Sequence, residues 1–265
     1  MDTRFNSKMF FDNIYFLIKK RNEKIGDLES TAGVSTGYIS RTSKESGAKP
    51  GIDFIISVAS YLKISIDTLL TVDLSSLTPT ELYLVSFFEK LKSDTVNDKL
   101  GWEKNSSDSL NYEEPDLNGV LSHPLMNYET FYDLSESEYP EEVTRNVMVS
   151  NAFGHHTVIA GDCFSLNMAN NTTLHLMNIC KTIHKVNDPN ARAVEVWMTN
   201  NSGSQVYIGS NMEGMNLKYI IDDLYQTIVE NLKYPKLNDS IRFAIESYME
   251  KGIQPNDIDY SDLPF

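Results

Sequence analysis

The spacing of apolar residues changes once along the chain, and this change limits the possible folds more than any other feature. In the first third they recur every three to four positions, as in Phe10, Ile14 and Leu17, which is the spacing of an amphipathic helix. From Asn146 onward they alternate instead, as in "DCFSLNM" and "AVEVWMT", which is typical of half-buried strands. The sequence therefore predicts an all-α N-terminal bundle and an α+β C-terminal domain.

The second part ends on helices rather than strands. "NNSGS" between two alternating runs is a hairpin turn signal, and helical spacing returns after Leu217 and again after Ile241. We expect an antiparallel sheet of about four or five strands with helices at its C-terminal end.

Five segments are predicted along the chain. Thr78, Pro79 and Glu81 form a capping-box pattern that begins a connecting helix. The residues that follow lack periodicity and are rich in Ser, Asn, Glu, Asp and Pro, which is typical of a linker. The segments are a five-helix domain over 1–77, the connecting helix over 78–92, an irregular acidic linker over 93–140, an α+β effector or interaction domain over 141–251 and an acidic tail over 252–265.

Charge is divided unequally between these segments. The 265 residues carry a formal net charge of -14. Up to Leu70 there are 10 Lys and Arg against 8 Asp and Glu, so the remaining residues carry -16. Because the field of a surface steers partners, a mildly basic first segment and a strongly acidic body are expected to meet different ones.

Composition narrows the cellular setting. Cys163 and Cys180 are the two cysteines, too few for a disulfide framework and without the paired spacing of a zinc ribbon. The N-terminus does not have the pattern of a secretion signal, and no run approaches 18 apolar residues. We expect a cytoplasmic protein that does not span a membrane.

One short segment of the basic part looks suited to nucleic acid. "AGVSTGYISRTSK", residues 32–44, offers Val34 and Ile39 to a core and turns polar residues outward. Gly33 is expected in the left-handed conformation that ends the preceding helix, and Ser35 is expected to be the N-cap of the next one.

Together with the residues around it, this segment resembles a known family. "IGDLESTAGVSTGYIS" followed by "KPGIDFIISVASYLKISIDTLL" is similar to the Cro/repressor-type helix-turn-helix domain of the XRE family. The match covers residues 10–70, about a quarter of the chain, with the turn, the K-P and the S-x-D-x-L-L element in order. Glu29 stands where that family has Ala, and we expect its side chain to reach the rim of the bundle.

The resemblance implies a helix-turn-helix bundle that binds a double-stranded DNA operator as a homodimer. It implies that Thr36, Gly37 and Arg41 lie where the family reads base edges, with Arg41 as the best reader because a guanidinium can bond guanine bidentately. It also implies that Ser35 caps the recognition helix. Ser40, Lys44 and Lys49 fall near phosphate-contacting positions. The alternative is a bundle of this kind used for dimerisation or protein contact.

The sequence does not indicate catalysis, a cofactor or a metal. His155 and His156 are adjacent, and the other histidines are not at metal-ligand spacing from them. Cys163 lies near them but alternates with core positions of a strand, as a small buried cysteine would. The common catalytic and phosphate-binding motifs do not occur.

Two hypotheses of function remain. In the first, the chain is a sequence-specific transcriptional regulator whose C-terminal domain senses a small ligand or sets the oligomeric state. In the second, it is an interaction protein of a phage or other mobile element. There the acidic C-terminal domain binds or inhibits a protein partner and the helix-turn-helix regulates expression of the protein itself.

Overall fold

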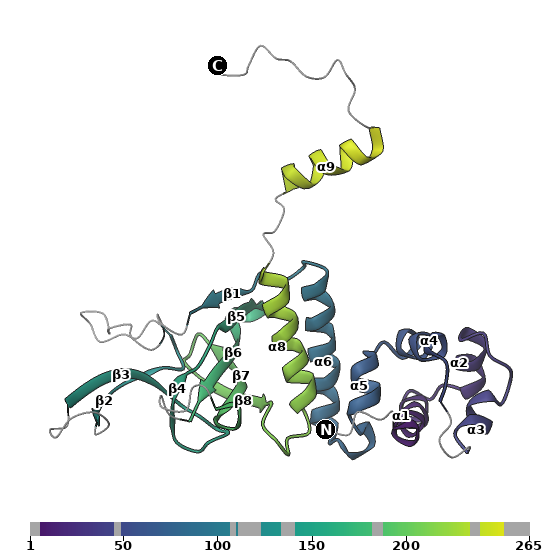
Figure 1. Ribbon diagram of the computed structural model, residues 1–265, viewed down its shortest axis with the longest axis horizontal. Helices are drawn as coiled ribbons and strands as arrows, with labels where there is room; N and C mark the ends of the chain where they lie inside the picture. The colour runs from purple at the N-terminus through teal and green to yellow at the C-terminus, as the bar shows by residue number, and fades with distance from the viewer. Residues whose placement is uncertain are drawn as a thin grey trace, which may run out of the picture. The chain divides into compact units, whose positions relative to one another are not determined.

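The computed structural model describes residues 6–44, 49–106, 110, 123–133, 141–181, 188–233 and 239–251. It shows a mixed α+β protein, as the sequence predicts (Figure 1). The chain divides into two compact units, Met1–Ile228 and Val229–Phe265. Within the described part no helix is long and apolar enough to cross a bilayer.

Helices alone occur in the described residues before Glu103. They are α1 (Ser7–Lys20), α2 (Ile25–Thr31), α3 (Tyr38–Thr42), α4 (Ile52–Leu62), α5 (Ile66–Thr71), the short 3-10 helix η1 (Leu74–Ser76) and α6 (Pro79–Val96). Each of the seven supplies at least one side chain with no exposed surface: Phe10, Leu28, Ile39, Leu62, Leu69, Leu74 and Phe88. Burying such a side chain stabilises the fold by about 1.5–3 kcal/mol, so apolar residues at helical spacing help to hold these short helices in place.

A buried amide ties α1 to the end of this segment. Asn13 has no exposed surface, and its Nδ2 donates to the carbonyl oxygens of Leu69 and Val72 at 3.0 and 2.7 Å. Its Oδ1 accepts from the backbone N–H of Leu74 at 3.0 Å. One side chain thereby satisfies three backbone groups where α5 ends and η1 begins.

Helix α6 joins the preceding helices to the rest of the first unit. It carries the expected capping box at Thr78 and continues to Val96, one turn beyond the predicted end. Glu89 accepts from Ser65 Oγ and Thr68 Oγ1 at 2.8 and 2.6 Å, while Lys92 forms an ion pair with Asp223. Helix α6 is therefore held to α5 by one part of its surface and to α8 by another.

The strands of the described part form one antiparallel sheet of eight strands. They are β1 (Glu103–Asn105), β2 (Asn127–Asp133), β3 (Glu141–Val149), β4 (His156–Ile159), β5 (Cys163–Met168), β6 (Thr172–Cys180), β7 (Arg192–Asn200) and β8 (Gln205–Ser210). The prediction of an irregular linker over 93–140 is wrong for β1 and β2, and four or five strands was too few. Strand β1 is three polar residues that pair with β5, so apolar periodicity could not reveal it.

Strand β6 is the centre of the sheet. Along one edge it pairs with β7 from Thr172 to Cys180. Along the other it pairs first with β5 and then with β4, through Val158 and Ile159. Gly161 lies between β4 and β5, where a Cβ atom would lie 2.6 Å from Nδ2 of Asn178. A Cβ atom there would displace the Asn178 amide, whose Nδ2 donates to Tyr225 OH at 2.8 Å, so glycine is favoured where the chain passes from β4 to β5.

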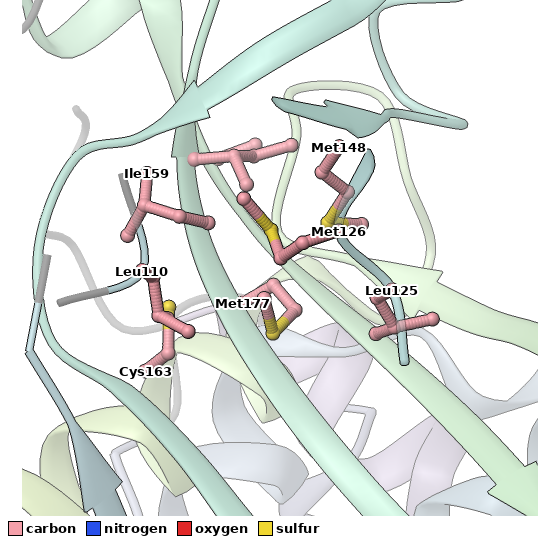
Figure 2. Packing of buried hydrophobic residues seen from close by; sticks show 9 residues of the cluster. Leu110, Leu125, Met126, Met148, Ile159, Cys163 and Met177 are labelled. Atoms are coloured by element: carbon pink, nitrogen blue, oxygen red, sulfur yellow. The ribbon is translucent and has the colours of Figure 1, made fainter. Parts of the chain in front are cut away.

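The two faces of the sheet carry different side chains. One face includes Phe164, whose ring lies 5.4 Å from that of Tyr225 in α8 (Lys218–Lys233). On the strands, Cys163 and Met177 belong to another buried cluster, which Figure 2 shows together with Met126 and Met148.

The predicted C-terminal helices are α8 and α9 (Asp239–Lys251), and the predicted tail over 252–265 lies outside the described residues.

A buried carboxylate holds the connection between β3 and β4. Glu195 in β7 has no exposed surface. It accepts from Ser150 Oγ at 2.8 Å, from the backbone N–H of Ala152 at 2.5 Å and from Trp197 Nε1 at 2.8 Å. Each carboxylate oxygen thus has at least one donor, which is the condition for burying such a group.

A buried imidazole in the sheet is expected to make the stability of the protein depend on pH. His175 Nδ1 lies 2.9 Å from Ser165 Oγ, and its Nε2 lies 2.8 Å from Thr199 Oγ1. Burial, with a smaller effect of the neighbouring His123, lowers the pKa of His175 to about 3. The ring is therefore neutral in the folded protein at ordinary pH.

We expect acid to destabilise the protein through His175. An unfolded histidine has a pKa of about 6.5. Below this pH the unfolded chain therefore binds a proton at this residue, whereas the folded chain does not. The free energy of unfolding should fall by about 1–2 kcal/mol from pH 6.5 to 5, and His175 should contribute no pH dependence above 7.5. Urea unfolding at these pH values measures it. On unfolding, His175→Gln should take up about one proton less than the original protein in this pH window, so its free energy of unfolding should depend less steeply on pH. An unchanged slope of this free energy against pH would contradict the assignment.

Candidate nucleic-acid interface

The turn after α2 is closed by its own backbone. The N–H of Val34 donates to Glu29 O at 3.0 Å, and that of Gly33 donates to Ser30 O at 3.2 Å. Gly33 has a φ of 67°, the left-handed conformation predicted for it. This is the Schellman arrangement, in which the residue after the helix must adopt positive φ.

Helix α3 begins later than the sequence predicts. The prediction that Ser35 is its N-cap is wrong, because the N-cap is Gly37 with a φ of 77°. The backbone N–H of Tyr38 donates to Ser35 O at 2.9 Å, so Ser35 starts the turn that leads into the helix. Gly37 at the N-cap has no side chain to accept from the first N–H groups of α3, so the helix is capped by a residue from elsewhere in the chain.

Glu29 supplies that cap. Its Oε2 accepts from the N–H of Gly37 at 2.8 Å and its Oε1 accepts from the N–H of Ile39 at 2.9 Å. The expectation that this side chain reaches the rim is wrong, since it is only 2% exposed. A carboxylate at the start of a helix satisfies free N–H groups and is favoured by the helix dipole. Glu29 therefore links α2 to α3 from the inside.

Arg41 closes the same turn from the outside. Its Nη1 donates to Thr36 O at 3.0 Å and its Nη2 donates to Ser35 Oγ at 2.8 Å. A Cβ atom on Gly37 would lie 3.2 Å from Nη1, so the guanidinium covers this glycine closely. The hydroxyl predicted to cap the helix thus holds the side chain predicted to read bases.

Most of the predicted contact residues are brought together. Ser35, Thr36, Arg41 and Lys44 are exposed on the turn and at the end of α3, and Gly37 and Ser40 are half-buried among them. Lys49 is also exposed but follows residues 45–48, which are outside the described ranges. In the part of the chain that the structure describes, Arg41, Lys44 and Lys49 form no ion pair.

Aromatic side chains fix α3 against the other helices. The ring of Tyr38 lies 5.0 Å from that of Phe54 in α4, and Tyr15 OH lies 3.4 Å from Ser43 Oγ. Neither the contact of Tyr15 nor the inward position of Glu29 is predictable from the apolar pattern of the sequence. An apolar pattern does not indicate contacts between residues far apart in the chain. The one signal in the sequence was Glu29 itself, an acid at a position where an apolar residue was expected.

The residues considered for catalysis and metal binding do not converge. Cys163 is buried, and burial raises its pKa to about 12, so the thiol stays protonated and is a poor nucleophile. The exposed His155 stacks beside Phe153 at 6.1 Å between ring centres. Among the described residues, no group of three or more His, Cys, Asp or Glu side chains could hold a metal ion.

The chain was compared with protein-family models, curated proteins and solved structures, and none of these comparisons found a match.

Proposed function

We propose that this protein is a sequence-specific DNA-binding regulator of transcription that acts as a homodimer. The observation that carries the proposal is the exposed polar surface of the turn and α3. Glu29 holds it from within, and Arg41 and Lys44 are exposed on it. In this proposal the segment 25–44 works as a helix-turn-helix of the Cro/repressor type, the family that the sequence resembles.

Arg41 reads a base in this proposal while staying attached to the turn. A guanidinium has five N–H donors, and Arg41 uses two of them for Thr36 and Ser35. The remaining donors can reach the O6 and N7 atoms of a guanine in the major groove, a contact that discriminates by about 1–3 kcal/mol. The two contacts to the turn restrict the side chain beforehand, which lowers the entropy lost on binding.

Lys44 and Lys49 have a different role. Both are exposed, and a flexible ammonium suits a phosphate better than a base edge. The acidic body, which carries -16 beyond Leu70, repels the phosphates. Attraction is therefore confined to the basic first segment, and this favours one orientation of the protein on DNA.

The test begins with selection of bound sequences from a random pool of duplex DNA. On the selected site, Arg41→Ala should weaken binding about tenfold to a hundredfold, with a much smaller effect on unrelated DNA. Lys44→Ala should weaken both almost equally and lower the slope of log K against log salt by about one. Equilibrium binding at two salt concentrations measures each effect.

Arg41→Lys is the matched control, because it keeps the charge and loses the planar fork. It should lose discrimination almost as far as Arg41→Ala does. Equal weakening of specific and unrelated DNA by Arg41→Ala would assign this side chain to the phosphate backbone. A pool from which no sequence is enriched would contradict the proposal and favour protein contact as the use of this surface.

A further inference from the structure

A pocket lies where α6 meets the preceding helices. Its volume is about 220 Å³, and its walls come from the end of α1, the turn between α4 and α5, η1 and α6. The floor is apolar and includes Leu17, Leu74 and Val85, which are at most 7% exposed. At roughly 30 Å³ per water molecule, the pocket has room for a small organic molecule.

The rim of this pocket is cationic. Lys20, Arg21 and Lys63 line it, and among the described residues no acidic side chain does, in a chain whose net charge is -14. Arg21 is held there by a hydrogen bond from its Nη2 to Leu62 O at 2.5 Å. Lys63 has a φ of 49°, a backbone conformation that residues other than glycine rarely adopt.

Helix ends alone do not account for three cations. Helices α1 and α4 both end at the pocket, at Lys20 and Leu62. Each C-terminus carries the equivalent of about half a negative charge, so the two together offset about one cation. A positive charge of about two is left beside an apolar floor, and this combination fits a ligand with one anionic group and one apolar body.

We propose that this pocket binds a small organic monocarboxylate with a compact apolar body. The carboxylate lies between Lys20, Arg21 and Lys63, and the body displaces water from the half-buried side chains of Ile64 and Leu82. A bound ligand contacts α1 and α6 at once and so strengthens the attachment of α6 to the bundle. The proposal does not depend on DNA binding, and its test contains no DNA.

The probe is sodium benzoate, added to the full chain and followed in two-dimensional amide NMR spectra at constant ionic strength. We expect saturable shifts at Ile64 and Ser86, which line the pocket. Benzamide has the same body without the charge and should bind at least tenfold more weakly. Sodium acetate keeps the single charge of a carboxylate but has almost no apolar body, and it should not saturate these shifts.

A paired variant tests the rim directly. Lys20→Met combined with Lys63→Gln changes only exposed side chains and should weaken benzoate at least tenfold. Lys24→Met, an exposed lysine that does not line the pocket, should leave the affinity unchanged. Equal binding of benzoate and benzamide to the unaltered protein would overturn the proposal, as would shifts confined to other parts of the chain or unchanged affinity in the paired variant.

Discussion

Glu29→Ala is expected to lower the free energy of unfolding by about 3 kcal/mol, since a hydrogen bond to a charged group contributes about 1.5–3 kcal/mol. The change removes both acceptors at the start of α3 and leaves the N–H groups of Gly37 and Ile39 without them. Ile39 has no exposed surface, so water cannot easily replace the lost partner. Urea unfolding measures the loss, and the same variant should lose specific DNA binding because the turn is no longer held.

Two comparisons separate the cap from the charge. Glu29→Gln keeps one carbonyl oxygen but turns an amide N–H₂ toward the second donor. Its free energy of unfolding should therefore lie between those of the original protein and of Glu29→Ala. Glu23→Ala removes an exposed glutamate from the loop before α2 and should change stability by less than about 0.5 kcal/mol. If Glu29→Ala were no more harmful than Glu23→Ala, the cap would be unimportant.

Glu195→Ala is expected to cost more, about 4 kcal/mol, because three buried or half-buried donors lose a charged acceptor. These donors are the hydroxyl of Ser150, the N–H of Ala152 and the indole N–H of Trp197. The connection between β3 and β4 should loosen before the rest of the sheet. Amide hydrogen exchange at Ala152 and Phe153 reports this local loss, and urea unfolding reports the total.

Glu103→Ala is the matched control for the sheet. Glu103 is an exposed carboxylate on β1 that accepts from Asn167 at 3.2 Å, and its loss should cost less than about 1 kcal/mol. Faster exchange spread evenly over all strands in Glu195→Ala would show that the carboxylate supports the whole sheet rather than one connection.

The sequence predicted most helices because their evidence is local. Apolar residues at helical spacing and the capping box at Thr78 lie within a few positions of one another, and α6 begins where that pattern predicts. The start of α3 was misplaced because its cap is not local: Glu29 reaches Gly37 and Ile39 across the turn. Ser35 has the right chemistry for a cap, but its hydroxyl accepts from Arg41 instead.

The sheet was predicted in kind but not in extent. The alternation in "DCFSLNM" and "AVEVWMT" marks β5 and β7, and the register that pairs both with β6 agrees with one shared apolar face. Strand β1 is recognisable only through its partner, 60 residues further along the chain, as in the contact of Asn105 with Ser165. Pairing between backbones leaves no apolar pattern in a short polar strand.

The central position of β6 also sets the order in which the sheet can assemble during synthesis. Strands β4 and β5 share one edge of β6, and β7 takes the other. The ribosome therefore releases β1 to β5 before the strand that joins them, and only the pairings of β1 with β5, β2 with β3 and β3 with β4 are available until Cys180 emerges. Helices α1 to α5, whose contacts are closer in sequence, can fold while the later half of the protein is still being made.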